Sequence, residues 1–153
     1  DIGNKNYEYG AIVHAFKKYR DKYKTFVFLQ DSMLLENEIS ELEDLGNNYL
    51  VFKEEKSGWW CDVWAHDYFY ERHEDFPQLP KNNFQMVIWN TFAINTNTFD
   101  RVINSELFSK VQPPINKIGS EYMERVWSIL FSNTSIGYKI NKTSIKKIFA
   151  RRQ

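Results

Sequence analysis

The sequence has little of what several protein classes require. It contains one cysteine, Cys61, in 153 residues, so no internal disulfide can form and a disulfide-stapled secreted domain is excluded. No apolar run approaches the roughly 18 residues that cross a bilayer, and the first residues lack the charged-then-apolar order of a signal peptide. We therefore expect a cytoplasmic protein without a transmembrane segment. If the protein associates with a membrane, we expect it to do so through a part outside this chain.

Several chemical motifs are missing as well. The six glycines are scattered, and neither the Walker pattern nor the dinucleotide-binding pattern occurs. Cys61 is followed by Asp62, whose carboxylate disfavours the thiolate that a nucleophilic cysteine needs. One segment holds side chains that can bind a metal ion: Asp62, His66, Asp67, Glu71 and His73. It lacks a compact His-x3-His or Cys-x2-Cys spacing, so we interpret its histidines as structural and not as metal ligands.

What the chain does have is a folded domain's composition and an uneven charge. It is 42% hydrophobic and 17% aromatic with zero net charge, which predicts one ordered domain over residues 1–153. The zero is the sum of +3 for residues 1–30, −10 for 31–80 and +7 for 81–153. The acidic middle suits a divalent cation or basic partner, and the basic part suits a phosphate-bearing ligand or an anionic surface. Segregation of charge among solvated loops is the alternative.

Hydrophobic periodicity predicts an α/β fold, because a helix leads directly into a short, buried strand. The residues from 57 to 76 are aromatic and acidic without a clear period. Ser120 is the expected cap of the clearest helix, and the basic tail 143–152 is weakly amphipathic. The expected elements are a helix over 7–22, strands over 25–30 and 49–52, a helix over 32–45, one or two strands within 84–94, and helices beginning at Asn97 or Thr98 and at Ser120.

The most informative polar pair is Asp31-Ser32, placed where the strand over 25–30 ends. In open α/β sheets, ligands bind beyond the carboxyl ends of the strands. A carboxylate there can hold a divalent cation that bridges a diphosphate. The alternative is that Asp31-Ser32 only caps the following helix.

Two segments carry a resemblance to a known family. Asn4-Lys-Asn-Tyr-Glu-Tyr-Gly-Ala11 and Phe26-Val-Phe-Leu-Gln-Asp-Ser32 resemble signatures of glycosyltransferases related to rhamnan-synthesis and other surface-polysaccharide enzymes. The resemblance implies a GT-A fold, a Rossmann-like mixed sheet flanked by helices, and transfer of a sugar from a nucleotide-sugar donor to a glycan acceptor. It implies donor binding by Asn4, Glu8, Gly10, Asp31 and Ser32, and Mn²⁺ or Mg²⁺ at Asp31.

The chain departs from that family pattern in three ways. Asn6 replaces a family glycine, and Asp31 lacks the second acid of an Asp-x-Asp motif, which leaves metal dependence open. A GT-A domain normally opens with a nucleotide-binding strand, whereas here the family motif begins at residue 4. We therefore expect a single GT-A-like domain that is N-terminally incomplete or abbreviated.

The later part of the chain supplies candidates for catalysis and acceptor binding. Sugar transfer with inversion needs a carboxylate to take a proton from the attacking hydroxyl, and Glu121 and Glu124 begin the acidic face of the last predicted helix. Complementing the helix dipole is an equal alternative for either glutamate. Trp59, Trp60 and Trp89 are candidates for stacking on acceptor sugars, although most tryptophans are core residues.

Two other functions remain open from the sequence. One is a non-catalytic module that binds a glycan or protein partner on the same fold, consistent with the lone strand-end acid. The other uses the basic C-terminal block to bind nucleic acid, but no recognisable nucleic-acid motif occurs, so we expect no nucleic-acid partner. The basic tail suits peripheral contact with an anionic membrane surface, and a solvated helix end is the alternative that we favour.

Overall fold

The computed structural model describes residues 6–56, 63–78 and 84–148. Their main feature is a mixed four-stranded sheet with the strand order β1-β4-β3-β5. Strand β4 (Phe92–Asn95) runs antiparallel to β1 (Thr25–Phe28) and to β3 (Tyr49–Val51), and β5 (Tyr138–Ile140) runs parallel to β3. Strands β1, β3 and β5 therefore share one direction, and their carboxyl ends lie at one edge of the sheet.

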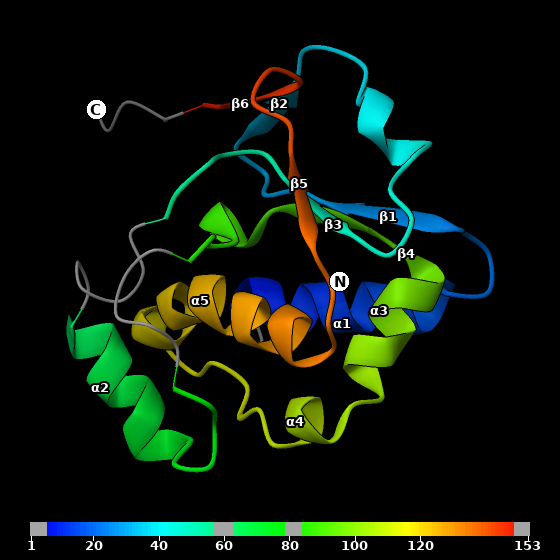
Figure 1. Cartoon of the computed structure of the whole chain (residues 1–153). Coiled ribbons are helices and arrows are strands. Elements are labelled where there is room, and N and C mark those ends of the chain that lie inside the picture. Colours follow the sequence, from blue (N-terminus) through cyan, green and yellow to red (C-terminus); the bar gives the residue numbers. More distant parts are fainter. Residues whose placement is uncertain (1–5, 57–62, 79–83, 149–153) are drawn as a thin grey trace.

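Helices cover one face of this sheet, as Figure 1 shows. Helix α1 (Tyr7–Tyr19), α3 (Thr96–Ile103) and α5 (Lys117–Asn133) lie beneath the strands, with α4 (Glu106–Ser109) and α2 (Val63–Arg72) farther out. The expected mixed α/β class and helix-flanked mixed sheet are confirmed. No helix in the described ranges combines the length and hydropathy that a membrane crossing needs.

The larger core explains the high aromatic content. Alternate residues of a strand point to opposite faces, so Val51, Phe92 and Ile94 face the helices. There Trp127 of α5 is fully buried, with its ring centroid 5.4 Å from that of Phe92 and 5.7 Å from that of Tyr9. Aromatic side chains bury large areas, so a few of them fill the space between the sheet and the helices.

The opposite face of the sheet carries a smaller cluster, and here one prediction is wrong. Leu50 and Ala93 point to this face and pack with Ile39 and Leu45. The helix expected over 32–45 is absent: the segment forms β2 (Met33–Leu35) and a single 3-10 turn, η1 (Ser40–Leu42). Its apolar residues are used for strand pairing and for covering the sheet, so tertiary contacts override the helical spacing.

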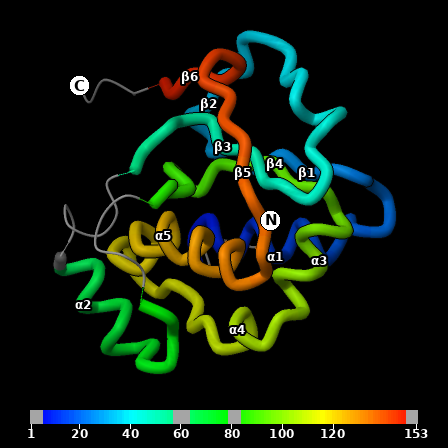
Figure 2. Tube along the Cα trace, in the orientation of Figure 1, coloured from blue at the N-terminus to red at the C-terminus, as the bar shows by residue number. Residues whose placement is uncertain are grey.

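The C-terminal tail also differs from expectation. Residues 145–147 form β6 (Ile145–Lys147), antiparallel to β2 in the register Met33↔Lys147. Figure 2 shows this segment beside residues 33–35, although more than 100 positions separate them in the sequence. The favoured solvated helix end is therefore wrong for this part of the tail; residues 149–153 lie outside the described ranges.

Other boundaries shift by a few residues. The segment without a clear period contains α2, and the apolar stretch before β4 includes a short turn, η2 (Ile88–Asn90), rather than a second strand. Asn116, not Ser120, caps α5: its Oδ1 accepts a hydrogen bond from the Gly119 backbone N–H at 2.9 Å. Ser120 is thereby free for another role.

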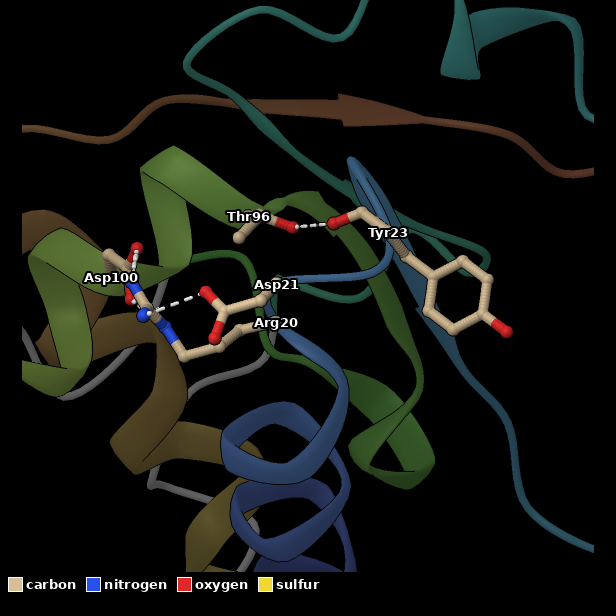
Figure 3. Close-up of polar contacts among 5 residues, drawn as sticks. All are labelled: Arg20, Asp21, Tyr23, Thr96 and Asp100. Carbon is tan, nitrogen blue, oxygen red and sulfur yellow. Dashed lines mark hydrogen bonds and ion pairs between the residues drawn. The ribbon is translucent and has the colours of Figure 1, made fainter.

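The end of α1 is fixed to the start of α3 at the edge of the sheet opposite the carboxyl ends. The Arg20 guanidinium donates to both carboxylate oxygens of Asp100, at 3.0 and 2.5 Å, and also reaches Asp21 at 3.3 Å (Figure 3). In the same view, Thr96 Oγ1 donates to the Tyr23 carbonyl oxygen at 2.5 Å. These contacts set the direction in which α1 crosses beneath the sheet, and hence where its first turn lies.

Candidate functional site

Polar residues gather at the carboxyl edge of the sheet. Gln30, Asp31 and Ser32 follow β1, Lys53 follows β3, and Trp89 lies just before β4, whose first residue pairs with the last residues of both β1 and β3. The antiparallel direction of β4 thus brings the segment before it to the edge where the neighbouring strands end. This edge is where open α/β sheets place their ligands.

A cleft of about 570 Å³ opens at this edge. It is bounded by the first turn of α1, the segment after β1 and the end of β6. It continues into a hollow of about 250 Å³ that reaches Asn90. The cleft is lined by Tyr7, Glu8, Ala11, Leu29, Gln30, Asp31, Ser32 and Lys147.

Glu8 is the carboxylate that both parts of the cleft share. Its Oε1 accepts a hydrogen bond from Gln30 Nε2 at 3.0 Å, and its Oε2 accepts one from Ser120 Oγ at 2.6 Å. Glu8 therefore joins α1, the segment after β1 and α5 at one point. The two hydrogen bonds fix the orientation of the carboxylate.

Asp31 and Ser32 lie in the cleft wall, as predicted for residues beyond a strand end. The alternative that they cap a helix is wrong, since β2 follows them. Asp31 is exposed, whereas Ser32 is half-buried and its Oγ accepts from Lys147 Nζ at 2.6 Å. Lys147 also donates to Gln30 Oε1.

Two lysines, one of them from the cleft wall, lie over the Trp89 ring. Lys53 Nζ lies 5.1 Å from the centroid of this ring and Lys147 Nζ lies 5.5 Å from it. The Trp89 backbone N–H donates to Glu124 Oε1 at 3.1 Å, and the Val87 N–H donates to the Glu124 carbonyl oxygen at 2.8 Å. Glu124 therefore holds the 87–89 segment against α5.

The backbone at the cleft is strained on both sides. Two consecutive residues with left-handed φ, Asn6 (62°) and Tyr7 (54°), begin α1, and two more, Trp89 (59°) and Asn90 (53°), precede β4. Bulky side chains seldom adopt this conformation, and it concentrates at functional sites. Asn90 Oδ1 is also buried without a hydrogen-bond partner among the described residues, so a hydrogen-bond donor in the inner hollow would satisfy it.

The remaining predicted residues lie elsewhere or outside the described ranges. Gly10 is an interior residue of α1, and Glu121 is half-buried on α5; neither lines the cleft. Asn4, Trp59 and Trp60 lie outside the described residues, as do Cys61 and Asp62.

The described part of the acidic segment, residues 63–78, holds both of its histidines, His66 and His73. The described residues contain no group of three or more His, Cys, Asp or Glu side chains that could hold a metal ion. His73 is buried, with Nδ1 3.0 Å from the Phe69 carbonyl oxygen and Nε2 accepting from the Gln112 N–H at 2.9 Å. Both ring nitrogens of His73 therefore have partners within the protein.

Three cleft residues were missed by sequence reasoning. Gln30 was assigned to the strand, Ser120 was taken as a cap, and Lys147 was placed on a helix end. Of the three, only Gln30 could have been predicted from the sequence, because it directly precedes Asp31. The other two reach the cleft through long-range contacts, from α5 to Glu8 and from β6 to Ser32.

Comparison with known proteins yields no relative: no protein-family model, no curated protein and no solved structure matches this chain.

Proposed function

We propose that the chain is a GT-A-like glycosyltransferase that moves a sugar from a nucleotide-sugar donor to a glycan acceptor. The observation that carries the proposal is the convergence of Glu8, Asp31 and Ser32 in one cleft at the carboxyl edge of the sheet. The sequence resemblance had selected these three residues from segments about twenty positions apart. Their meeting in one cleft, through the contact between Glu8 and Gln30, supports the proposal.

Glu8 is the carboxylate best placed to act as the general base. In the transfer, the acceptor hydroxyl oxygen bonds to the anomeric carbon while the bond from that carbon to the phosphate oxygen breaks. The leaving nucleoside diphosphate takes the electron pair, and the hydroxyl proton passes to a carboxylate. Glu8 lines the cleft and is held by Gln30 and Ser120, whereas Glu124 is not among the residues that line the cleft or its inner hollow.

The other residues then have supporting roles. Glu124 is a positioning residue, because it fixes the segment that presents the Trp89 ring. That half-buried ring, flanked by Lys53 and Lys147, offers a flat apolar surface for a sugar or a base. Asp31 and Ser32 line the part of the cleft assigned to the donor.

The test is release of nucleoside diphosphate from a panel of UDP-, GDP- and dTDP-sugars, with simple glycosides as acceptors and with water as the default acceptor. Wild-type chain should release one nucleotide, and Glu8→Gln should bind the same donor but lose turnover by about 10²-fold or more, as expected for a general base. Glu106→Gln, at an exposed acid on α4, is the matched control and should keep full turnover. Absence of donor binding and turnover across the panel, or an unchanged rate in Glu8→Gln, would overturn the proposal.

A second candidate is a non-catalytic module that binds a glycan or protein partner. The lack of a three-ligand metal group among the described residues favours it, because simple binding requires no counter-charge for a leaving group. Glycan binding that is independent of nucleotide, without donor hydrolysis, would select this candidate.

A further inference from the structure

The end of the chain brings a positive charge to the cleft. Lys147 is the last residue of β6, opposite Met33 in the β2–β6 pair. The backbone N–H of Ile148 donates to the Ser32 carbonyl oxygen at 2.7 Å, which continues the pairing by one step. This register fixes the Lys147 backbone beside the segment that follows β1.

The partners of the Lys147 ammonium group are neutral. It donates to Gln30 Oε1 and to Ser32 Oγ, and it lies over the Trp89 ring. Among the described residues, no carboxylate forms an ion pair with it, whereas Lys53 pairs with Glu55 at 3.4 Å and Lys142 with Glu54 at 2.8 Å. Lys147 is thus held in place by groups that leave its charge uncompensated.

A divalent cation fits this cleft poorly. Mg²⁺ binds through one or two carboxylates with phosphates and waters; of the two carboxylates that line the cleft, Glu8 already accepts hydrogen bonds at both oxygens, which leaves the exposed Asp31 as its main ligand. The side chain next to it, Ser32, is already bonded to the Lys147 ammonium group. A metal ion at Asp31 would therefore be close to a fixed positive charge.

We propose that Lys147 replaces the divalent cation, and binds the diphosphate of the donor directly. This inference rests on the proposed function for the identity of the ligand. An incoming phosphate takes the place of the Gln30 and Ser32 oxygens at the ammonium group, which has three donors. As the bond between sugar and phosphate breaks, negative charge grows on the leaving diphosphate, so Lys147 stabilises the transition state more than the bound donor.

The experiment is calorimetric titration of the chain with UDP, GDP, dTDP and inorganic pyrophosphate, in excess EDTA and separately with Mn²⁺. The variants are Lys147→Met, which removes the charge, and Lys147→Arg, which restores it. Lys146→Met is the matched control, because Lys146 is the adjacent, exposed residue of the same strand. Urea unfolding of each variant verifies that β6 remains folded.

We expect wild-type chain to bind one nucleoside diphosphate equally well in EDTA and in Mn²⁺. Lys147→Met should weaken binding by about 10- to 100-fold, the effect of losing a charge-assisted hydrogen bond, while Lys147→Arg and Lys146→Met stay near the wild-type affinity. Binding that requires Mn²⁺, or that is unchanged in Lys147→Met, would overturn the role of Lys147 and leave the proposed function intact. Metal-free binding of pyrophosphate but of no nucleotide would retain Lys147 as an anion site and refute the nucleotide-sugar function. Binding of no probe would refute both.

Discussion

Protonation of His73 should destabilise the contact between the end of α2 and the segment that leads to α5. The His73 side chain is buried, Nδ1 lies 3.0 Å from the Phe69 carbonyl oxygen, and Nε2 accepts from the Gln112 backbone N–H at 2.9 Å. These partners assign the single proton of the neutral ring to Nδ1. A second proton would occupy Nε2 and break the bond from Gln112.

The surroundings of the ring lower the pKa of His73 below its ordinary value. Burial is the main cause, and the positive charge of Arg72 adds to it, while the hydrogen bond to Phe69 acts in the opposite direction. Phe69 stacks on the imidazole with ring centroids 4.2 Å apart, and Phe76 contacts its edge at 5.0 Å. An imidazolium ion would lose most of its hydration in this position.

The sign of the pH effect follows from proton counting. An unfolded histidine binds a proton near pH 6.5, whereas folded His73 binds one only at lower pH, so the unfolded state holds more protons between these values. The free energy of unfolding should therefore fall as the pH drops below about 6.5, by up to about 1.4 kcal/mol per pH unit. The fall should stop once the pH is below the folded-state pKa.

Urea unfolding between about pH 8 and pH 5 measures this effect. His73→Gln retains a donor and an acceptor without titrating, so its free energy of unfolding should depend less on pH than that of the wild type. His14→Gln, at an exposed position of α1, is the control and should follow the wild type. Equal pH dependence in His73→Gln and wild type would refute the reasoning.

Three further substitutions test the fold and the cleft by urea unfolding. Arg20→Ala should lower the free energy of unfolding only slightly, because the Arg20 side chain is 40% exposed, and the loss should shrink in high salt; a loss that salt leaves unchanged would argue against the ion pair with Asp100. Gly46→Ala should cost about 1 kcal/mol although no atom lies within 4 Å of the added Cβ, since Gly46 has φ of 57°; a neutral result would contradict the left-handed turn. Glu8→Ala should lower the free energy of unfolding by about 2 kcal/mol and Ser120→Ala by about 1 kcal/mol. In the double variant the two losses should not add, with a coupling of about 0.5 kcal/mol or more; additive losses would contradict the hydrogen bond between the two side chains.

The elements that the sequence predicted are those set by local pattern. The apolar spacing that begins at Tyr9 predicted α1, and the short apolar runs that contain Phe28 and Val51 predicted β1 and β3. The helix predicted over 32–45 is wrong because residues 33–35 pair with the strand at 145–147, and no local pattern indicates a pairing at that sequence distance. The expectation that this first strand is buried also failed in part, since β1 is an edge strand with three half-buried residues.

In the candidate site too, the residues predicted from the sequence are those in local motifs, and the missed ones depend on long-range contacts. Glu8, Asp31 and Ser32 belong to two segments close in sequence, and the resemblance together with the strand-end rule placed them at a ligand site. Lys147 and Ser120 reach the cleft only after β6 pairs with β2 and α5 packs beside α1. Their contribution depends on tertiary register, which is why a basic, weakly amphipathic tail was interpreted as a helix end.

Four of the five non-glycine residues with left-handed φ in the described ranges lie at or beside the cleft. A non-glycine residue in the left-handed region costs roughly 1–2 kcal/mol, and such residues persist only where the surroundings fix them. Trp89 is fixed by its N–H bond to Glu124 and by the two ammonium groups at its ring, and Asn90 is fixed by its Nδ2 bond to the Ser120 carbonyl oxygen at 3.3 Å. A glycine at position 89 would remove the strain together with the ring. The fold therefore keeps an aromatic surface beside Lys147 at the expense of stability, and this arrangement supports the proposal that both bind the donor.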